Sequence, residues 1–526
     1  MKREKEKKLI AVSLPYANGE AHIGHIAGAY LPADIYYRFT KLIGEDSIFI
    51  SGTDMHGTGV VLSAEKEGVD PYVFSQKNHE KFKKIFGELD IKFDIYSNTQ
   101  TDIHINTVHE IFLDLYTSKY IKIREEEQPY CDYDKRFIPD RYVEGTCPIC
   151  MDKNAKVSES CDICSTLIQF DTIIEPRCKI CGNTPILKKT HNFFLELELL
   201  EKEIRDYIDK KNDFRKNVKD FSLEYIKNGL IPRSITRDMS YGVSIPIKGF
   251  EEKIIYVWFE ALIGYISATR EIKKNNWEDY WKGNSKSIFF MAKDNIVFHS
   301  IILPFILLAD KNKLNLPYQI VANENLLLEG EKMSKSKNHF MLAKSALLRY
   351  GKDNLRFYIA ANLPEKKDFN FKEEELINLV NTTLSSNIGN YINRTLTFLY
   401  KNFDGSIEKL SSEEDEEYIK NTFEKINSEF SEFRIKSAIG EIINFSDYAN
   451  KRFDTLKIWE NKDIGNMYIL VQYVYALGIL LAPVIPESSE KILSILNKKI
   501  DNFEYTPYFG EINEPYIIFP KIELNI

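Results

Sequence analysis

Positive charge is not in excess in this sequence. Its 70 lysines and arginines are outnumbered by 78 aspartates and glutamates, which gives a net charge of −8 at pH 7. This balance argues against nonspecific coating of nucleic acid, although it is compatible with a local basic groove. Internal repeats and low-complexity linkers are also absent, which excludes a repeat array.

The sequence lacks an apolar leader as well. Its first residues, MKREKEKK, form a charged arm without the apolar segment of a secretory signal. The stretch 468–485 is nearly apolar enough and long enough to span a bilayer, but it contains Gln472 and Pro483 and lies among charged helical segments. We therefore expect a core helix in this stretch, no membrane association and a cytoplasmic protein.

The chain is long, and it alternates strands with helices. With 526 residues, 44% of them hydrophobic and 28% charged, it can form a large core and roughly two to four domains. Strands are predicted at 9–14, 47–52, 287–295 and 318–324, with helices at 26–43 and 296–309. Because β-α-β units have parallel strands and right-handed crossovers, the simplest fold is α/β: one doubly wound parallel sheet of the Rossmann type, split by an insertion.

Helical patterns replace strand patterns after about residue 370, and they predict an all-α bundle. All seven cysteines lie between the two halves of the sheet. The predicted units are a Rossmann-type domain in two halves (1–115 and 251–325), a connective insertion with zinc knuckles (116–250), a polar loop and connecting region (326–370), and the bundle (371–526).

Two histidines stand where the first strand gives way to the first helix, in SLPYANGEAHIGH (13–25). Ligands of open α/β sheets bind beyond the carboxyl ends of the strands, where helix N-termini point unpaired N–H groups at anions. There, His22 and His25 can face one phosphate chain, and Gly24 leaves room for a ring or phosphate. Imidazoles at this place suit charge that builds on phosphorus during a displacement. Taken alone, the pattern fits surface or helix-capping histidines equally well.

A second motif, LEGEKMSKSKN (328–338), carries Lys332, Lys335 and Lys337 on a polar loop after the second β-α-β unit. Lysines on such a loop suit a pyrophosphate leaving group, whose charge grows as the bond breaks. A solvated charge run is the alternative, but it explains the interleaved Met333 and serines less well.

The cysteines favour structural zinc. Six of them form C-x2-C pairs, whose spacing lets two thiolates grip one tetrahedral Zn²⁺. Three such pairs in a protein expected to be cytoplasmic argue against disulfides and redox pairs, and four protein ligands would leave no open position on the metal. The first predicted zinc site consists of Cys147, Cys150, Cys161 and Cys164.

HIGH (22–25) with KMSKS (332–336) resembles the paired signature of class I aminoacyl-tRNA synthetases. LPYANGEAHIGH, GTDMHGT, PDRYVEGTCPIC and YVWFEALIGY are similar to the methionyl-tRNA synthetase family in particular, and the likeness runs from about Leu9 to the closing EPYIIFPKIE. HIGH alone is a weak signal. The two signatures about 300 residues apart, with cysteine knuckles between them, form a specific one.

The resemblance implies that ATP activates L-methionine to methionyl-adenylate, which is then transferred to the 3′-terminal ribose of tRNA(Met). AMP and diphosphate are released, and no covalent protein intermediate is required. Carried over position by position, His22 and His25 steady the phosphates in the transition state, while Lys332 and Lys335 hold the departing pyrophosphate with Mg²⁺. The resemblance further assigns ATP contacts to Asn18, Gly24, Asp294 and Lys335.

The same resemblance places the ammonium group of methionine at Asp54, with help from the backbone of Leu14. The side chains expected to enclose the thioether are Tyr16, Trp258, Tyr265 and His299. Ordinary core packing is the alternative for a lone tryptophan. The sequence departs from the family pattern at Leu262, Leu303 and Ala292, and in KSKN after the signature serine, so the shape of the thioether pocket and the ribose contacts are the open points.

A second zinc site is supported by the resemblance to two-zinc members of the family. It would consist of Cys131, Asp134, Cys178 and Cys181. Asp134 is its unusual ligand, because structural zinc sites rarely use a carboxylate. The alternative is an emptied knuckle with spare thiols, so one or two zinc ions per chain are expected.

The helical bundle is where the family reads the tRNA anticodon. Asn390 and Arg394 lie four apart on one predicted helix face, and Trp459 lies in a predicted short loop. An aromatic ring beside arginine and asparagine donors suits the reading of unpaired bases. Without the resemblance, these residues would be assigned to a solvated face and a core tryptophan. We also expect a monomer.

Three rival functions differ in features that the sequence shows. Synthetases for leucine, isoleucine and valine carry a much longer editing insertion, and the cysteine enzyme needs zinc in its amino-acid pocket. A small nucleotidylyltransferase could use HxGH but needs neither KMSKS nor knuckles. A non-catalytic, zinc-dependent RNA-binding protein would bind tRNA but would not catalyse the amino-acid-dependent exchange of pyrophosphate with ATP.

Overall fold

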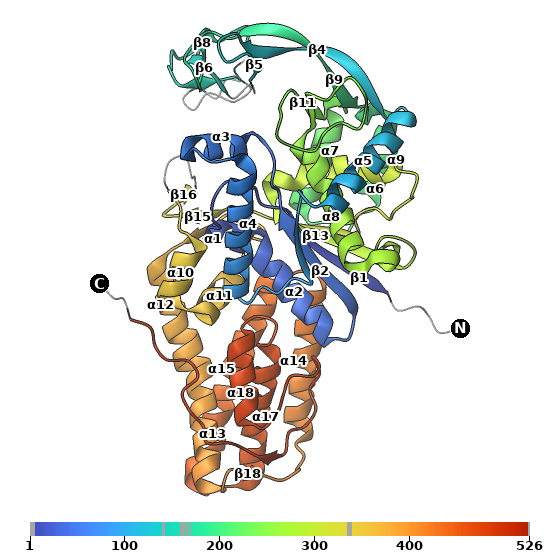
Figure 1. Ribbon diagram of the computed structural model, residues 1–526. Coiled ribbons are helices and arrows are strands. Elements are labelled where there is room, and N and C mark those ends of the chain that lie inside the picture. The colour runs from blue at the N-terminus through green and yellow to red at the C-terminus, as the bar shows by residue number, and fades with distance from the viewer. Residues whose placement is uncertain are drawn as a thin grey trace.

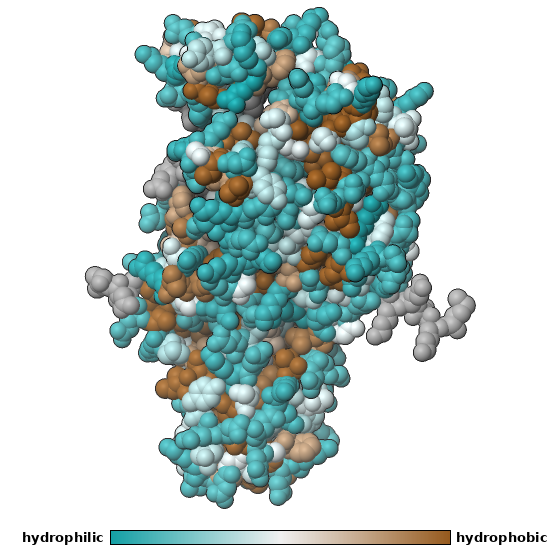
Figure 2. Space-filling view, in the orientation of Figure 1, coloured by the Kyte–Doolittle hydropathy of each residue, from teal (hydrophilic) through white to brown (hydrophobic). Residues whose placement is uncertain are grey.

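The structure, a computed structural model, describes residues 6–138, 142–157, 164, 168, 170–333 and 339–523. A parallel sheet occupies its middle, an arched ribbon extends from one end, and a helical bundle extends from the other (Figure 1). The face in Figure 2 is mainly hydrophilic, with apolar side chains gathered in separate patches.

The central sheet has five parallel strands in the order β14-β13-β1-β2-β3. They are β1 (Lys7–Val12), β2 (Asp46–Thr53), β3 (Ile95–Asn98), β13 (Ser285–Ala292) and β14 (Gln319–Asn323). Ile10 of β1 lies opposite Phe49 on one side and Ile288 on the other. The predicted Rossmann-type sheet is thereby confirmed, with the strands of the two halves side by side and joined where β1 pairs with β13.

Helices cover both faces of this sheet. Successive residues of a strand point to opposite faces, and β1 follows this rule: Ile10 and Val12 join the core on the side of α2 (Leu31–Leu42) and α4 (Pro71–Glu88). Leu9 and Ala11 join the core on the opposite side, against α5 and α8. The helices of that second face are α5 (Asp102–Thr117), α8 (Val257–Lys273) and α9 (Leu303–Ala309).

Two segments that were predicted to be α-helical begin with π-helical turns. The segments 26–43 and 296–309 contain the π-helical turns η1 (Ile26–Tyr30) and η6 (Phe298–Ile302) before their α-helical parts. A proline, Pro32 or Pro304, follows each turn, and its missing N–H leaves a carbonyl of the turn without its α-helical partner. The Asn323 amide donates to one such carbonyl, that of Gly28, at 2.9 Å. The predicted strand 287–295 ends at Ala292, where the 3-10 turn η5 (Lys293–Asn295) begins.

The insertion begins as a long antiparallel ribbon of β4 (Ile121–Cys131) and β9 (Ile186–Leu195). At its far end lies a small sheet of β6 (Val143–Thr146), β7 (Ala155–Lys156) and β8 (Ile174–Cys178), which lies above α3 (Thr58–Glu67) in Figure 1. The chain then returns through α6 (Glu201–Lys210) and α7 (Lys216–Lys227). These two helices share the core of the α8 face, so the later part of the predicted insertion packs with the sheet.

Helices dominate after residue 370, as predicted. The bundle consists of α12 (Glu373–Leu379), η7 (Val380–Gly389), α13 (Asn390–Asn402), α14 (Glu413–Ser431), α15 (Ile435–Leu456), α16 (Ile458–Asn461), α17 (Ile464–Leu480) and α18 (Pro486–Ile495). Short strands do persist: β18 (Ser406–Ile407) pairs with β19 (Gly510–Glu511). The apolar stretch near 468–485 forms the buried helix α17, and within the described residues no helix combines the length and apolarity needed to cross a membrane.

A buried ion pair lies where the connecting region, the sheet domain and the bundle meet. Arg356 of α11 (Lys352–Ala361) is 1% exposed and donates to the Asp34 carboxylate of α2 at 2.7 Å. Its guanidinium also donates to the carbonyls of Leu89 at 3.0 Å and Val484 at 2.8 Å. One side chain therefore holds α2, the end of α4 and the turn after α17 together.

Candidate active site

The two predicted motifs lie in contact at the carboxyl end of β1. The short helix α1 (Ile23–His25) follows the loop after β1, and the Ile23 N–H donates to the Met341 carbonyl at 3.0 Å. A Cβ atom placed on Gly24 would lie 2.7 Å from Met333 Cε and 2.9 Å from His22 Nδ1. Only glycine fits there without displacing a neighbour. Because Met333 of the second motif lies this close to Gly24 of the first, the two motifs can share one ligand.

The two histidines are stacked on each other. Their ring centroids are 3.7 Å apart, and the His22 N–H donates to His25 Nδ1 at 3.1 Å. Because His25 Nδ1 accepts this bond, the proton of the neutral ring resides on Nε2. The helix-capping alternative therefore holds for one nitrogen of His25.

Lys332 lies on β16 (Glu331–Lys332), which pairs with β15 (Leu326–Leu328); β15 also pairs with β17 (Phe369–Phe371). Its Nζ is 3.2 Å from the Asp294 carboxylate, and both side chains are exposed. Two candidate ATP contacts from distant segments thus meet beside the motif pair. Lys335 and Lys337 lie outside the described residues.

Asp54 is a buried carboxyl group just after β2. Its backbone is fixed on both sides, because its carbonyl accepts from the Ala17 N–H at 2.8 Å and its N–H donates to the Pro15 carbonyl at 2.9 Å. Burial, and then the negative charge of Glu260, raise the pKa of Asp54 well above its ordinary value, although the His56 backbone N–H partly opposes this shift. A cation beside Asp54 would favour its ionised form.

The four expected wall residues lie in two pairs. The Trp258 indole N–H donates to the Tyr16 hydroxyl. Tyr265 OH lies 2.8 Å from His299 Nε2, and His299 Nδ1 lies 2.9 Å from the Asn295 carbonyl. Because a carbonyl only accepts, His299 Nδ1 carries the proton and Tyr265 donates to Nε2. Burial lowers the pKa of His299 to about 4, so the ring is neutral at physiological pH.

The space beside Tyr265 is nearly closed. Leu14, Gly264 and Tyr265 border a cavity of about 10 Å³, and a Cβ atom on Gly264 would lie 3.3 Å from Leu14 Cδ2. A ligand larger than a water molecule enters only when these side chains move. Leu262 and Leu303, two departures from the family pattern, are buried in the same core.

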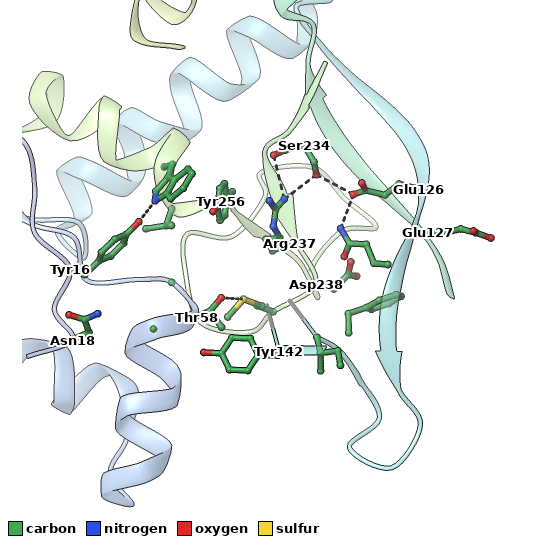
Figure 3. A pocket seen from close by; sticks show the side chains of 18 residues that line it. Tyr16, Asn18, Thr58, Glu126, Glu127, Tyr142, Ser234, Arg237, Asp238 and Tyr256 are labelled. Atoms are coloured by element: carbon green, nitrogen blue, oxygen red, sulfur yellow. Dashed lines mark hydrogen bonds between the residues drawn. The ribbon is translucent and has the colours of Figure 1, made fainter. Parts of the chain in front are cut away.

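A larger cavity of about 550 Å³ lies between the sheet domain and the insertion. Tyr16, Asn18 and Thr58 line one side, while Glu126 and Arg237 line the other (Figure 3). The predicted site residues Tyr16, Asn18 and Trp258 thus border a space that is open to the ribbon of the insertion.

Sequence reasoning missed a buried group behind Asp54. The Glu260 carboxylate accepts from His56 Nδ1 at 2.9 Å, and His104 Nε2 lies 3.5 Å from it. All three side chains are buried. His56 and Glu260 stand inside the quoted motifs GTDMHGT and YVWFEALIGY, so their presence in those motifs was the available signal.

Comparisons with known proteins agree with this geometry. A family model described as tRNA synthetases class I (M) matches residues 8–396. The methionine–tRNA ligases of Pyrococcus furiosus and Sulfurisphaera tokodaii are each 37% identical, over 98% and 99% of this chain and 75% and 96% of their own length. The chain belongs to the class I tRNA synthetases of the methionine group. The solved methionyl-tRNA synthetase of Mycobacterium tuberculosis in complex with methionyl-adenylate shares the fold, with a TM-score of 0.80 and 22% identity over 98% of this chain and 100% of that one.

In this class I synthetase, the insertion gathers the cysteines into two groups. Cys131, Asp134, Cys178 and Cys181 form one, and Cys147, Cys150 and Cys164 form the other, with the ligand atoms of each group within 4.8 Å of one another. Cys161 lies outside the described residues. Tetrahedral zinc with thiolate bonds of about 2.3 Å places its ligands about 3.8 Å apart. The observed separations are 3.4 Å for Cys131–Cys181 and 3.6 Å for Cys147–Cys164, so both groups fit a metal ion.

The bundle of this synthetase brings Arg394 and Trp459 together through Phe453. The Arg394 guanidinium lies 3.9 Å from the Phe453 ring centroid, and that ring stacks on Trp459 at 5.8 Å. Trp459 is 47% exposed and Asn390 is exposed one turn before Arg394. The prediction of a loop at Trp459 was wrong: the residue lies in the one-turn helix α16, between Lys457 and Lys462, which both have positive φ.

Proposed function

We propose that this chain is a methionine–tRNA ligase, which activates L-methionine with ATP and transfers it to tRNA(Met). The observation that carries the proposal is the contact of Gly24 with Met333, because it brings both signature motifs of a class I synthetase to one place. ATP–pyrophosphate exchange, measured with each amino acid in turn, is the test. Exchange that prefers an amino acid other than methionine would overturn the assignment.

Activation requires an in-line displacement at the α-phosphate by the methionine carboxylate. We assign His22 and His25 to the phosphates, since a neutral imidazole with its proton on Nε2 can donate a hydrogen bond to charge that develops there. Lys332 and Lys335 would hold the pyrophosphate as it leaves. Asp294, which holds Lys332 at 3.2 Å, would contact the ribose, and Asn18 and Gly24 would border the nucleotide. Mg²⁺ bound with ATP would share the phosphate charge.

Methionine would bind with its ammonium group on Asp54 and the backbone of Leu14. Tyr16, Trp258, Tyr265 and His299 would enclose the thioether, whose sulfur is a weak acceptor. The neutral His299 suits this role, because a charged imidazolium would be costly beside an apolar chain. The Tyr265–His299 bond would keep both rings in place around the side chain.

Zinc would be held by the two cysteine groups, with Asp134 as a ligand of the outer site and Cys161 completing the inner one. Bound there, the metal would cross-link knuckles whose own apolar core is small. For the bundle, we propose that Asn390, Arg394 and Trp459 read the anticodon. The cytoplasmic location and the monomeric state stay predictions from the sequence.

A further inference from the structure

One buried carboxylate in the site has no part in the chemistry proposed above. Glu260 lies in the first turn of α8 and is fully buried. Burial opposes its ionisation, but the charge and hydrogen bonds of His56 and His104 outweigh that effect and lower its pKa. The helix N-terminus favours a negative charge at this position as well. Glu260 is therefore a carboxylate at neutral pH.

A second carboxyl group, Asp54, faces the same region. Among the described residues, no lysine or arginine forms an ion pair with either group, and the ionic partners of Glu260 are His56 and His104. Two buried carboxyl groups with no fixed cation between them repel each other and are costly to desolvate. Within the part of the chain that the structure describes, both histidines lie against Glu260 and no cationic side chain pairs with Asp54, so the ammonium group of an amino acid would supply the positive partner of Asp54.

Glu260 also joins the two elements that form the amino-acid pocket. It follows Trp258 by two residues on α8, and His56 follows Asp54 by two residues on the loop after β2. The bond of 2.9 Å from His56 Nδ1 to Glu260 therefore ties this loop to the helix that carries the aromatic wall. This bond sets the distance between the Asp54 carboxylate and the aromatic side chains expected to enclose the thioether.

We propose that Glu260 is a positioning residue for the amino-acid substrate, acting through His56 on the loop that carries Asp54. This inference rests on the proposed function, because it takes Asp54 to be the ammonium site. Glu260 itself touches no substrate. It holds the Asp54 carboxyl at a fixed distance from the thioether wall, and its charge makes the pocket demand a cationic amine.

The test is ATP–pyrophosphate exchange by Glu260→Gln, with Glu271→Gln as the matched control. Glu271 lies on the same helix and accepts from Ser97 Oγ at 2.6 Å, so the control also removes a hydrogen-bonded carboxylate from α8. We expect Glu260→Gln to raise the KM for methionine roughly 10- to 100-fold. The KM for ATP and kcat should stay within about twofold of the wild type, as should all constants of the control.

His56→Gln should reproduce the higher KM, and the double variant should add little to either single change, because both act on one contact. Glu260→Asp, which keeps the charge, should restore part of the affinity. Equal rises in both KM values with a lower kcat, or strictly additive single effects, would show a general structural role and overturn the proposal.

A pH profile supplies a readout that a structural role would not move. The ionisable groups around Asp54 and Glu260 are His56 on the loop, His104 on α5, Tyr241, whose ring centroid lies 5.2 Å from that of His56, Tyr265 on α8 and His299 on η6. Asp54 must be ionised to bind ammonium, and Glu260 raises its pKa. The KM for methionine should therefore rise as the pH falls, and in Glu260→Gln this rise should begin at lower pH.

The same profile decides the matter if Glu260→Gln does not fold. His56→Gln should retain the acid rise of the wild type, and its disappearance would assign the titration to His56 and overturn the proposal. Wild-type enzyme that shows no methionine-dependent exchange would instead refute the proposed function itself, so the two failures are distinguishable.

Discussion

Gly24→Ala tests the contact between the two signature motifs. The added methyl group would lie 2.7 Å from Met333 Cε and 2.9 Å from His22 Nδ1. Met333 Cε is the end of a flexible side chain and can move, but the His22 ring is stacked on His25 and must turn. Overpacking of this kind costs about 1–3 kcal/mol, while alanine gains about 1 kcal/mol over glycine in a helix. The net loss of stability should be only about 0–2 kcal/mol.

Catalysis should suffer far more than stability. A displacement of about 1 Å in a group that positions the reacting phosphate can cost about 100-fold in rate. We therefore expect kcat for ATP–pyrophosphate exchange to fall about 100-fold in Gly24→Ala, with little change in the KM for methionine. Single-turnover formation of methionyl-adenylate would measure the step directly.

Gly28→Ala is the matched control for this experiment. It lies one turn further along the same helical segment, where a new Cβ atom would meet Ala292 Cβ at an ordinary 3.7 Å. Its activity should be close to that of the wild type. A Gly24→Ala enzyme with wild-type kcat would refute the reasoning, because the motifs would then not need this close approach.

Three further predictions follow from other parts of the molecule. Asp134→Ala should lower the metal content, measured by mass spectrometry of the native protein, from two ions per chain to one, while Asp134→Cys keeps two; a wild type with one ion would contradict the outer site. Trp459→Ala should lower kcat/KM for tRNA charging roughly 5- to 100-fold through lost base stacking and leave exchange unchanged; equal losses in both assays would exclude anticodon reading. His299 should make the wild type less stable in acid, because burial lowers its pKa from 6.5 to about 4 and the unfolded chain alone binds a proton in that interval. The contribution of the neutral His299 to the free energy of unfolding is complete above about pH 6.5 and falls by about 2 kcal/mol towards pH 5. Urea unfolding at these two pH values should therefore show a smaller loss of free energy of unfolding in His299→Gln than in the wild type.

The sheet was predictable because its strands are buried on both faces and therefore read as continuous apolar runs. The signature motifs were predictable for a similar local reason, since each combines its glycine, histidines or lysines within a few residues. Their contact was expected only because both would serve one ligand. The structure supplies the atoms that meet, Gly24 and Met333.

Other features depend on partners far away in the chain. The π-helical turn before Pro32 is completed by Asn323, which donates to the Gly28 carbonyl from a strand of the other half of the sheet. The apolar spacing at 26–43 is continuous and carries no sign of it. Glu260 and His56 are separated by 204 positions, and a carboxylate within an otherwise apolar helix pattern does not reveal what it binds.

The buried Arg356 has a consequence for how the enzyme meets its largest substrate. Because this one guanidinium donates both to α2 of the sheet domain and to the turn after α17 of the bundle, neither domain can slide without leaving an unpaired charge in the buried interior. The distance between the proposed phosphate site at His22 and His25 and the side chain of Trp459 is therefore fixed. If Trp459 reads the anticodon as proposed, a tRNA would have to span this fixed distance to reach both sites.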